Sequence, residues 1–357
     1  MAKKIGILTG GGDCPGLNAV IRAAVRTAVR DYQFEVVGIE EGFEGLMNLR
    51  TVPLNLESIR GILPKGGTLL RTTNRGNPFS YPVDGDPSSC VDRSDLVLEN
   101  FKKLGLEGLV VIGGEGTLKI AHQLHALGIP VVGVPKTIDN DINHTDFTFG
   151  FQTAVEIATQ AVDRLHTTAE SHNRVMILEV MGRHAGWIAL HSGIAGGADI
   201  ILVPEMPYHP RRIIETIEGR QRGGASFDII VVAEGAKRRG SEEVWVNKES
   251  KRLGGIAYQV AEDIHQHIDL EIRVTVLGHV QRGGSPNAAD RILASMYGKK
   301  AMDLVGEGAF GMMAALRGGE THAVPIADAI GALKTISPEA EMVRTAQSLG
   351  ISFGDGK

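Results

Sequence analysis

The sequence has little cysteine and no long apolar run, and these two shortages exclude whole classes of protein. Cys14 and Cys90 are the only cysteines, too few for the disulfide framework of a small secreted domain. The apolar run from Ile5 to Leu8 is shorter than the core of a signal peptide, and no other stretch reaches the length of a membrane span. We therefore expect a cytoplasmic protein without a membrane partner, in which Cys14 serves packing.

An excess of basic residues is also missing. The chain has 37 Lys and Arg against 42 Asp and Glu, a formal net charge of -5. Proteins that bind nucleic acid or anionic membranes usually carry a basic excess or patch, so we expect neither partner. Aromatic residues make up only 5%, but the 43% hydrophobic content and the length of 357 residues suffice for two lobes with buried cores.

Short runs rich in β-branched residues alternate with helix-like segments along the chain. This alternation predicts an α/β fold with parallel sheets. The first helix is expected after the turn at residues 10–12, because Leu17, Ile21, Ala24, Val25 and Ala28 recur with the period of a helix packed on a sheet. Strands are expected at residues 4–9, 35–39, 109–112, 131–134, 175–180, 200–203, 229–233 and 274–277.

Glycine-rich turns follow several of these strands. They occur at residues 10–13, 113–117, 181–183 and 277–279. Ligands of open α/β sheets bind at the carboxyl ends of the strands, so these turns predict a ligand-binding cleft. The stretch 71–95, rich in Pro, Gly, Ser and Asp, is expected to be a long surface loop.

Two of the turns have the composition of phosphate-binding loops. The glycines at 10–12 let backbone N–H groups approach phosphate, although a tight strand-to-helix turn would need them as well. Glu115 lies between glycines, where a carboxylate suits a hydrated Mg²⁺ better than it suits packing.

The segment from Thr137 to Asp141 combines a hydroxyl with two carboxylates. If the segment is extended, Thr137, Asp139 and Asp141 point to one side while Ile138 packs behind them. Such a group can position and deprotonate an alcohol, whereas the alternative is a capping or turn role.

Several arginines lie beside glycines, at strand starts or in turns, where a planar guanidinium can bind phosphate. A surface ion pair is an equally good explanation for each one alone. His279 could contact a sugar phosphate or a buried backbone group. The arginines are Arg75, Arg174, Arg183, Arg273 and Arg282.

Five motifs in this order resemble those of 6-phosphofructokinases, and the resemblance covers nearly the whole chain. They are TGGGDCPGLNAVIR (9–22), GGEGT (113–117), PKTIDND (135–141), EVMGRHAGW (179–187) and TVLGHVQRGGSP (275–286). The resemblance implies glycolytic transfer of the γ-phosphoryl of ATP to the 1-hydroxyl of fructose 6-phosphate, giving fructose 1,6-bisphosphate and ADP. It also implies an allosteric homotetramer with two doubly wound, mostly parallel lobes and an active site in the cleft between them.

The resemblance assigns roles to individual residues. Asp139 would be the general base, and the other catalytic residues would be Thr137, Asp141 and Arg183. Arg174 and Arg273 would reach the sugar phosphate across a subunit interface. The full sugar-phosphate set is Arg174, Met181, Gly182, Arg183, Glu234, Arg273, His279 and Arg282.

The donor set implied by the resemblance is Gly11, Arg75, Gly116, Thr117 and Lys136, with Glu115 as the Mg²⁺ carboxylate where the family usually has Asp. The donor lobe would span residues 1–150 plus about 281–331, and the sugar-phosphate lobe 151–280 plus about 332–357.

Two positions give conflicting indications of the phosphoryl donor. Gly116 resembles the ATP-dependent enzymes, whereas Lys136 resembles those that use pyrophosphate. We favour ATP, and keep a pyrophosphate-dependent enzyme of the same fold as the first alternative. A non-catalytic, nucleotide-sensing regulatory subunit is the second. A diacylglycerol- or NAD-kinase type of GGDGT signature is disfavoured, because those kinases lack the Thr137–Asp141 segment.

Regulation is expected to be weak. Arg22, Arg26 and Asp199 match the effector pocket of bacterial relatives, but His166, Ala225 and Phe227 stand where further basic residues are expected. The loss of these cations removes charge-assisted hydrogen bonds to phosphate-bearing effectors such as ADP and phosphoenolpyruvate.

Overall fold

The computed structural model describes residues 2–83, 86–247 and 252–356, and the chain divides into two compact units. Unit 1 comprises Met1–Ile138, Ile142–Gln152 and Arg282–Ala332, and unit 2 comprises Asp139–Asp141, Thr153–Gln281 and Leu333–Lys357. The chain therefore passes between the units within the Thr137–Asp141 segment and again after Ala332.

Unit 1 is built on a seven-stranded sheet in the order β15-β14-β7-β6-β1-β2-β3. The strands from β14 to β2 are parallel, and the edge strands β15 and β3 are antiparallel to their neighbours. The strands are β1 (Lys4–Thr9), β2 (Glu35–Ile39), β3 (Thr51–Leu54), β6 (Gly108–Gly113), β7 (Val131–Pro135), β14 (Met312–Arg317) and β15 (Glu320–Pro325).

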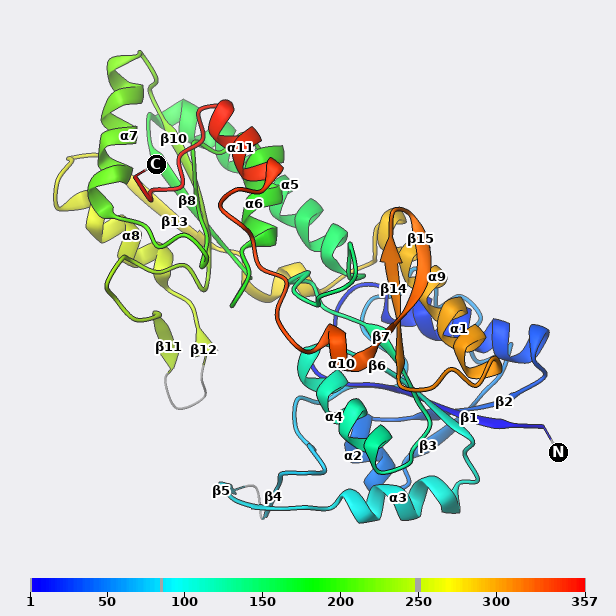
Figure 1. Ribbon diagram of the computed structural model, residues 1–357. Helices are drawn as coiled ribbons and strands as arrows, with labels where there is room; N and C mark the ends of the chain where they lie inside the picture. Colours follow the sequence, from blue (N-terminus) through cyan, green and yellow to red (C-terminus); the bar gives the residue numbers. More distant parts are fainter. Residues whose placement is uncertain (1, 84–85, 248–251, 357) are drawn as a thin grey trace. The chain divides into compact units, whose positions relative to one another are not determined.

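Helices cover both faces of this sheet (Figure 1). Helix α1 packs along α9 on one face, and α2, α3 and α4 lie on the other. The apolar stripe of α1 is buried as expected, since Leu17, Ile21, Ala24, Val25 and Ala28 have no exposed surface. The helices are α1 (Leu17–Asp31), α2 (Gly42–Met47), α3 (Ser94–Lys103), α4 (Glu115–Ala126), α9 (Ala288–Gly306) and α10 (Ile326–Ala329).

Unit 2 has a smaller sheet of four parallel strands in the order β13-β8-β10-β9. Helices α7 and α8 bury apolar side chains on one face, and α6 packs on β9 and β10. The elements are β8 (Val175–Val180), β9 (Ile200–Leu202), β10 (Asp228–Ala233), β13 (Ile272–Val276), α6 (Trp187–Ala195), α7 (Pro210–Arg222), α8 (Ile256–His265) and α11 (Glu341–Ser348).

The remaining elements are smaller or lie at the unit boundaries. Helix α5 and the 3-10 helix η1 each begin in one unit and end in the other. They are α5 (Phe151–His172), η1 (Gly278–Arg282), and the two-stranded sheets β4 (Tyr81–Val83) with β5 (Asp86–Val91) and β11 (Trp245–Asn247) with β12 (Arg252–Leu253).

The expected α/β fold with mostly parallel sheets is confirmed. All eight predicted strands form, with ends shifted by at most two residues. The stretch 71–95 was expected to be a loop, but it contains the β4–β5 hairpin and the start of α3. Its Pro and Gly content hid these short strands, which pair only with each other.

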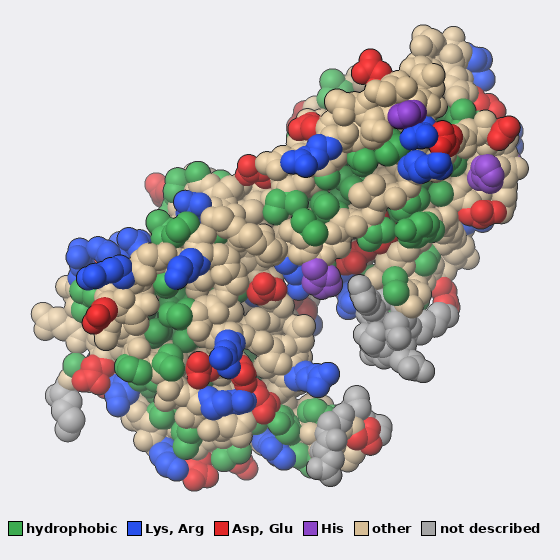
Figure 2. Space-filling model, turned by 180° about the vertical axis from the view of Figure 1, so that it is seen from behind, with side chains coloured by type: hydrophobic (Ala, Val, Ile, Leu, Met, Phe, Trp, Pro, Cys, Tyr) green, Lys and Arg blue, Asp and Glu red, His purple; other side chains and the backbone are tan. Residues whose placement is uncertain are grey.

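The surface and the helices agree with the composition. Figure 2 shows basic and acidic side chains interspersed with hydrophobic ones, as the near balance of 37 basic and 42 acidic residues predicts. Among the helices that the structure describes, none combines the length and the apolar character that crossing a membrane requires.

Strand order locates the site of unit 1. From β1 the chain moves to β2 on one side, and it later returns to β6 on the other side of β1. Such a reversal of strand order opens a crevice at the carboxyl ends of the two strands. The turn at Gly10–Gly12 follows β1 directly, while Gly113 ends β6 and Gly114 leads straight into α4, which begins at Glu115. We therefore place the ligand site of this unit between these turns.

Candidate active site

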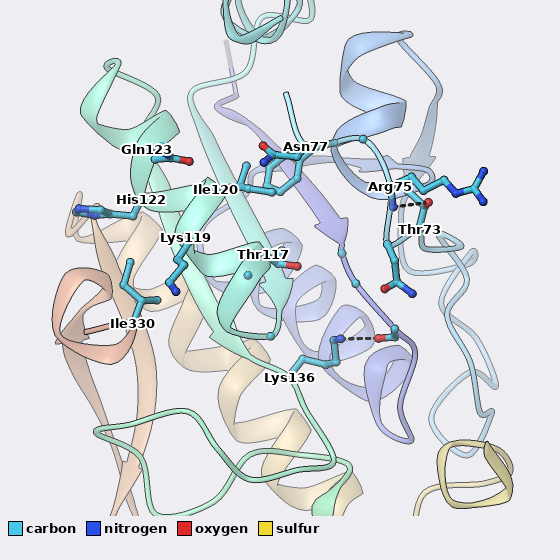
Figure 3. A pocket seen from close by; sticks show the side chains of 18 residues that line it. Thr73, Arg75, Asn77, Thr117, Lys119, Ile120, His122, Gln123, Lys136 and Ile330 are labelled. Atoms are coloured by element: carbon cyan, nitrogen blue, oxygen red, sulfur yellow. Dashed lines mark hydrogen bonds between the residues drawn. The ribbon is translucent and has the colours of Figure 1, made fainter. Parts of the chain in front are cut away.

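A cavity of about 670 Å³ lies at this crevice in unit 1. The two glycine turns line it, together with Lys136 after β7, Ile330 after α10, and residues from α2, α4 and the 71–95 stretch (Figure 3). All five predicted donor residues contribute to its lining, namely Gly11, Arg75, Gly116, Thr117 and Lys136. The volume lies within the range of ordinary small-molecule sites.

One end of the cavity is basic. Lys136 is 5% exposed, and its ammonium donates a hydrogen bond to the carbonyl of Gly12 (Figure 3). Arg75 and Lys119 also line the cavity. Helix α4 begins at Glu115 beside it, and the N–H groups of a first helical turn favour anions. This end can therefore hold a chain of phosphates.

The other part of the cavity is apolar. Phe43 from α2, Ile120 from α4 and Ile330 after α10 line it, with amides from Asn77 and Gln123 nearby (Figure 3). The sequence analysis missed these residues, because they come from three separate elements and belong to no motif. Together they can hold a flat, partly apolar group.

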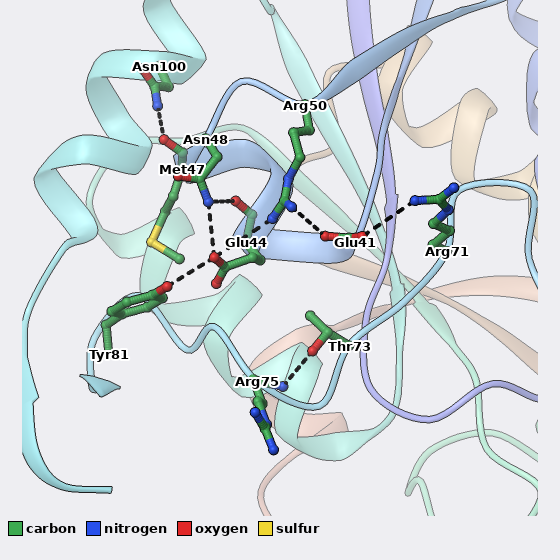
Figure 4. Close-up of polar contacts among 10 residues, drawn as sticks. All are labelled: Glu41, Glu44, Met47, Asn48, Arg50, Arg71, Thr73, Arg75, Tyr81 and Asn100. Atoms are coloured by element: carbon green, nitrogen blue, oxygen red, sulfur yellow. Dashed lines mark hydrogen bonds and ion pairs between the residues drawn. The ribbon is translucent and has the colours of Figure 1, made fainter. Parts of the chain in front are cut away.

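The stretch that carries Arg75 is fastened to helix α2 on both sides (Figure 4). On one side, Glu41 pairs with Arg50 at 2.7 Å and with Arg71 at 3.7 Å. On the other, the hydroxyl of Tyr81 donates to a carboxylate oxygen of Glu44 at 2.9 Å. These contacts fix the backbone between Arg71 and Tyr81, and hence the wall of the cavity.

The glycine turns leave room that larger residues would remove. A Cβ atom on Gly12 would lie 2.1 Å from a guanidinium nitrogen of Arg282, and one on Gly10 would lie 2.7 Å from the methyl of Thr117. Arg282, expected to bind the sugar phosphate, is therefore placed in unit 1 against the first glycine turn. A Cβ atom on Gly116 would meet no atom within 4 Å.

Glu115, the expected Mg²⁺ carboxylate, forms an ion pair with Lys119 one helical turn along α4. In the described parts of the chain, no three His, Cys, Asp or Glu side chains are arranged to hold a metal ion. A single carboxylate, that of Glu115, still fits Mg²⁺. This ion usually keeps several waters and binds one or two carboxylates together with substrate phosphates.

In unit 2, predicted sugar-phosphate residues follow the ends of adjacent parallel strands. Met181, Gly182 and Arg183 follow β8, and Glu234 follows β10. The N–H of Gly235 donates to the carbonyl of Gly182 at 3.1 Å, which ties the two turns together. Gly182 has a φ of 138°, a conformation that a side chain would strain.

The carboxyl of Glu234 lies in an unusual electrostatic environment. Burial, followed by the charge of Asp139, raises its pKa from 4.5 to about 7, although the Arg183 guanidinium acts in the opposite direction. The three predicted site residues Asp139, Arg183 and Glu234 are therefore close enough to interact electrostatically. Glu234 consequently titrates in the neutral range.

Arg174 and Arg273 share one acidic partner. Glu271 pairs with Arg174 at 2.7 Å and also with Arg273, and the pKa of Glu271 is lowered mainly by its hydrogen bond with Arg174. Glu271, just before β13, thus pairs with Arg273 of that edge strand and with Arg174, which precedes β8. His279 lies in η1 and is exposed.

The segment with the expected base is not extended. Asn140 has a φ of 54°, so the expectation that Thr137, Asp139 and Asp141 alternate along an extended chain was wrong. Asparagine adopts this left-handed conformation more readily than other non-glycine residues. Ile138 is buried as expected, and the Thr148 hydroxyl donates to the carbonyl of Thr137 at 2.7 Å.

Comparison with known proteins identifies the family. Residues 4–305 match the family described as Phosphofructokinase. The chain is 54% identical over 362 residues to "ATP-dependent 6-phosphofructokinase 2" of Clostridium perfringens, covering 99% of each chain. This chain belongs to the phosphofructokinase family.

Other phosphofructokinases are also similar to the chain. It is 48% identical over 357 residues to "Pyrophosphate--fructose 6-phosphate 1-phosphotransferase" of Streptomyces coelicolor, covering 98% of this chain and 100% of the relative. Among solved structures, Pichia pastoris phosphofructokinase in the T-state has a TM-score of 0.82 at 29% identity. That alignment covers 100% of this chain but only 37% of the Pichia chain.

The residues that replace expected effector cations are engaged inside unit 2. His166 shares a hydrogen bond of 2.7 Å with the carbonyl of Gly196 and meets the Phe227 ring edge-on at 5.8 Å. Asp199 pairs with Arg220 at 2.7 Å and accepts the N–H of Ile229 at 2.8 Å. In this phosphofructokinase, His166 and Asp199 are therefore tied into internal contacts.

The raised pKa of Glu234 predicts a pH-dependent stability. Because its folded-state pKa of about 7 exceeds the ordinary 4.5, the carboxyl stabilises the fold at low pH, and this contribution is lost as pH rises from 4.5 through 7. Glu234→Gln stays neutral and keeps the contribution. From pH 5 to pH 8, the free energy of unfolding should therefore fall by on the order of 3 kcal/mol more in wild type than in Glu234→Gln. Urea unfolding of wild type and Glu234→Gln across this pH range measures the difference, and Glu218→Gln at an exposed position is the control. If the free energies of unfolding of wild type and Glu234→Gln change with pH in parallel, the prediction is contradicted.

Proposed function

We propose that this protein is an ATP-dependent 6-phosphofructokinase, which transfers the γ-phosphoryl of ATP to the 1-hydroxyl of fructose 6-phosphate. The products are fructose 1,6-bisphosphate and ADP, as in glycolysis. The observation that carries the proposal is the cavity of unit 1, whose lining includes both basic residues such as Lys136 and the apolar residues Phe43, Ile120 and Ile330. A nucleotide triphosphate needs both kinds of group, whereas pyrophosphate needs only the basic ones.

Gly116 and Lys136, which point to different phosphoryl donors, have different roles in the proposed site. Gly116 lines the cavity, and apart from the adjoining backbone of α4 no atom lies within 4 Å of the position a Cβ would take there. Lys136 adds a cation that can contact a phosphate of either donor, so it is compatible with ATP. The Streptomyces relative named for pyrophosphate keeps the alternative donor as the second candidate function.

Catalysis would consist mainly of positioning and charge neutralisation, as phosphoryl transfer generally does. Asp139 takes the proton of the sugar hydroxyl, and Thr137 and Asp141 orient the acceptor and the transferring phosphoryl group. Arg183 binds and stabilises the phosphoryl oxygens. The proposed sugar-phosphate residues Met181, Gly182 and Glu234 hold the acceptor on unit 2, with contributions from His279 and Arg282.

Mg²⁺ is proposed to enter with ATP. When bound, it neutralises charge on the phosphate oxygens. Glu115 is the residue of this chain proposed to hold it, through an intervening water. Lys119, which lines the cavity and pairs with Glu115, would then contact the phosphates of ATP instead.

Assembly and location follow the same family-based reasoning. Unit 1 is proposed as the donor lobe and unit 2 as the sugar-phosphate lobe. We propose a cytoplasmic homotetramer in which Arg174 and Arg273 reach a neighbouring subunit's sugar phosphate, released from Glu271 when the phosphate takes its place.

A change at Gly116 tests the donor. Gly116→Asp places a carboxylate in the open part of the cavity, where it repels the phosphates of ATP and blocks the path to Phe43. Turnover coupled to aldolase should show kcat/KM for ATP reduced by about 100-fold or more, because such repulsion costs several kcal/mol. Gly219→Asp, at an exposed position of helix α7, is the matched control. Wild-type activity with pyrophosphate alone would overturn ATP as donor.

A change at Asp139 tests the base. Asp139→Ser should lower kcat by about 10²- to 10⁴-fold, the usual contribution of general-base catalysis, while the Kd for fructose 6-phosphate changes by less than about threefold. Stopped-flow turnover and calorimetric binding measure the two quantities. Asp163→Ser on exposed α5 is the control. Near-normal turnover of Asp139→Ser would remove Asp139 from this role.

A titration with effectors tests regulation. Phosphoenolpyruvate and ADP should each change the affinity for fructose 6-phosphate by less than the about fivefold of ordinary allosteric coupling, because His166 and Asp199 are already engaged. Since ADP is also a product, initial rates with phosphoenolpyruvate are the clearer measurement. Strong, saturable activation by ADP that disappears in Arg22→Ala would contradict the account.

A further inference from the structure

The segment that begins at Leu333 lies against the turn Asp139–Asp141, which carries the proposed base. At Leu333 the chain enters unit 2 for the last time. The ammonium of Lys334 donates to the side-chain oxygen of Asn140 at 2.9 Å. The backbone N–H of the same lysine donates to the carbonyl of Asp141 at 2.8 Å. One residue, 194 positions from Asn140 along the sequence, thus contacts the turn through its side chain and its backbone.

The other side of this segment is fixed to the start of helix α6. The indole N–H of Trp187 donates to the carbonyl of Lys334 at 2.8 Å, and the lysine ammonium lies 5.8 Å from the centre of the Trp187 ring. Two residues further on, the N–H of Ile336 donates to the Glu205 carboxylate at 2.9 Å. That carboxylate also accepts the N–H of Gly186 at 3.1 Å.

These contacts link two parts of the proposed site. Helix α6 follows directly on the turn with Arg183, and Asn140 lies between the two aspartates of the other turn. Asn140 has the left-handed φ of 54°, which surrounding contacts must hold in place. A hydrogen bond from a charged donor is roughly twice as strong as a neutral one, so Lys334 is well suited to this task.

We propose that Lys334 is a positioning residue for phosphoryl transfer. It holds Asn140 and Asp141 from one side while Trp187 anchors it from the other, so that Asp139 and Asp141 keep the orientation in which the sugar hydroxyl is deprotonated. The inference rests on the proposed function, since it concerns the same reaction. It assigns the lysine an effect on the chemical step through Asn140, and none on the binding of either substrate.

The test removes the ammonium and keeps the aliphatic chain. Lys334→Met should lower kcat by about 10- to 100-fold, because small displacements of reacting groups have effects of this size. The KM values for fructose 6-phosphate and ATP should stay within about threefold. Lys334→Arg keeps a charged donor and should recover a substantial part of kcat. Lys299→Met, which removes an ammonium from an exposed ion pair with Asp303 on α9, is the matched control and should leave kcat unchanged.

A second variant guards against a general loss of folding. Trp187→Phe keeps an aromatic ring at this position but loses the indole N–H bonded to Lys334 together with part of the ring, so it should lower kcat severalfold with both KM values preserved. All variants are compared well below the thermal transition of each. An unchanged kcat in Lys334→Met, a rise in KM without a fall in kcat, or a loss that Lys334→Arg does not reduce would each overturn the inference.

Wild-type turnover separates this inference from the proposed function. If wild type uses pyrophosphate instead of ATP, the proposed donor is wrong, and the same variants are compared with pyrophosphate. If wild type transfers phosphate from neither donor, the proposed function and the role of Lys334 both fail. If wild type is active and Lys334→Met equals it, only the role of Lys334 fails.

Discussion

Parallel pairing of β1, β6 and β7 is the constraint on which the proposed donor site depends. Thr9 pairs with Ile112 and Gly113 with Pro135, so the three strands end level with one another. The residues that follow them therefore meet at one edge of the sheet: the first glycine turn, the second glycine turn and Lys136. A shift of either pair by one residue would turn every side chain of a strand to the opposite face and take this set apart. The hydrogen bond from the Lys136 ammonium to the Gly12 carbonyl follows from this register of β1, β6 and β7.

The same principle operates in unit 2 with different chemistry. Ala233 pairs with Val180, so Glu234 and Met181 follow adjacent strand ends. Here the grouped residues include carboxyls, and burial with a neighbouring charge raises the pKa of Glu234 to about 7. The turn from Asp139 to Asp141 is not part of a strand, so pairing cannot fix it. It depends instead on tertiary contacts, which include the side-chain and the backbone hydrogen bond from Lys334.

How much the sequence could predict depended on whether a feature was local. The parallel strands are short runs rich in β-branched residues, so all eight were found, and the glycine turns after them indicated the phosphate site. Phe43, Ile330 and Lys334 could not be found, because only tertiary packing brings them to their sites and none belongs to a motif. The prediction that the chain is extended around Asn140 was wrong. One residue in the left-handed conformation breaks the alternation of side chains that an extended segment would have. The ion pair of Glu115 with Lys119 was not foreseen, because residues 113–117 were expected to form a turn, whereas α4 begins at Glu115 and brings the two residues one helical turn apart.

The central claim, that the cavity of unit 1 takes ATP as the phosphoryl donor for a sugar phosphate, is tested most directly by a competition experiment. Wild-type protein is given fructose 6-phosphate, Mg²⁺ and equal concentrations of ATP and pyrophosphate, and phosphorus NMR follows every phosphate in the mixture. The account predicts that the γ-phosphate signal of ATP declines while those of ADP and the 1-phosphate of fructose 1,6-bisphosphate grow, and that the pyrophosphate signal stays constant. Consumption of pyrophosphate with ATP unchanged would contradict it, as would the absence of any new sugar phosphate.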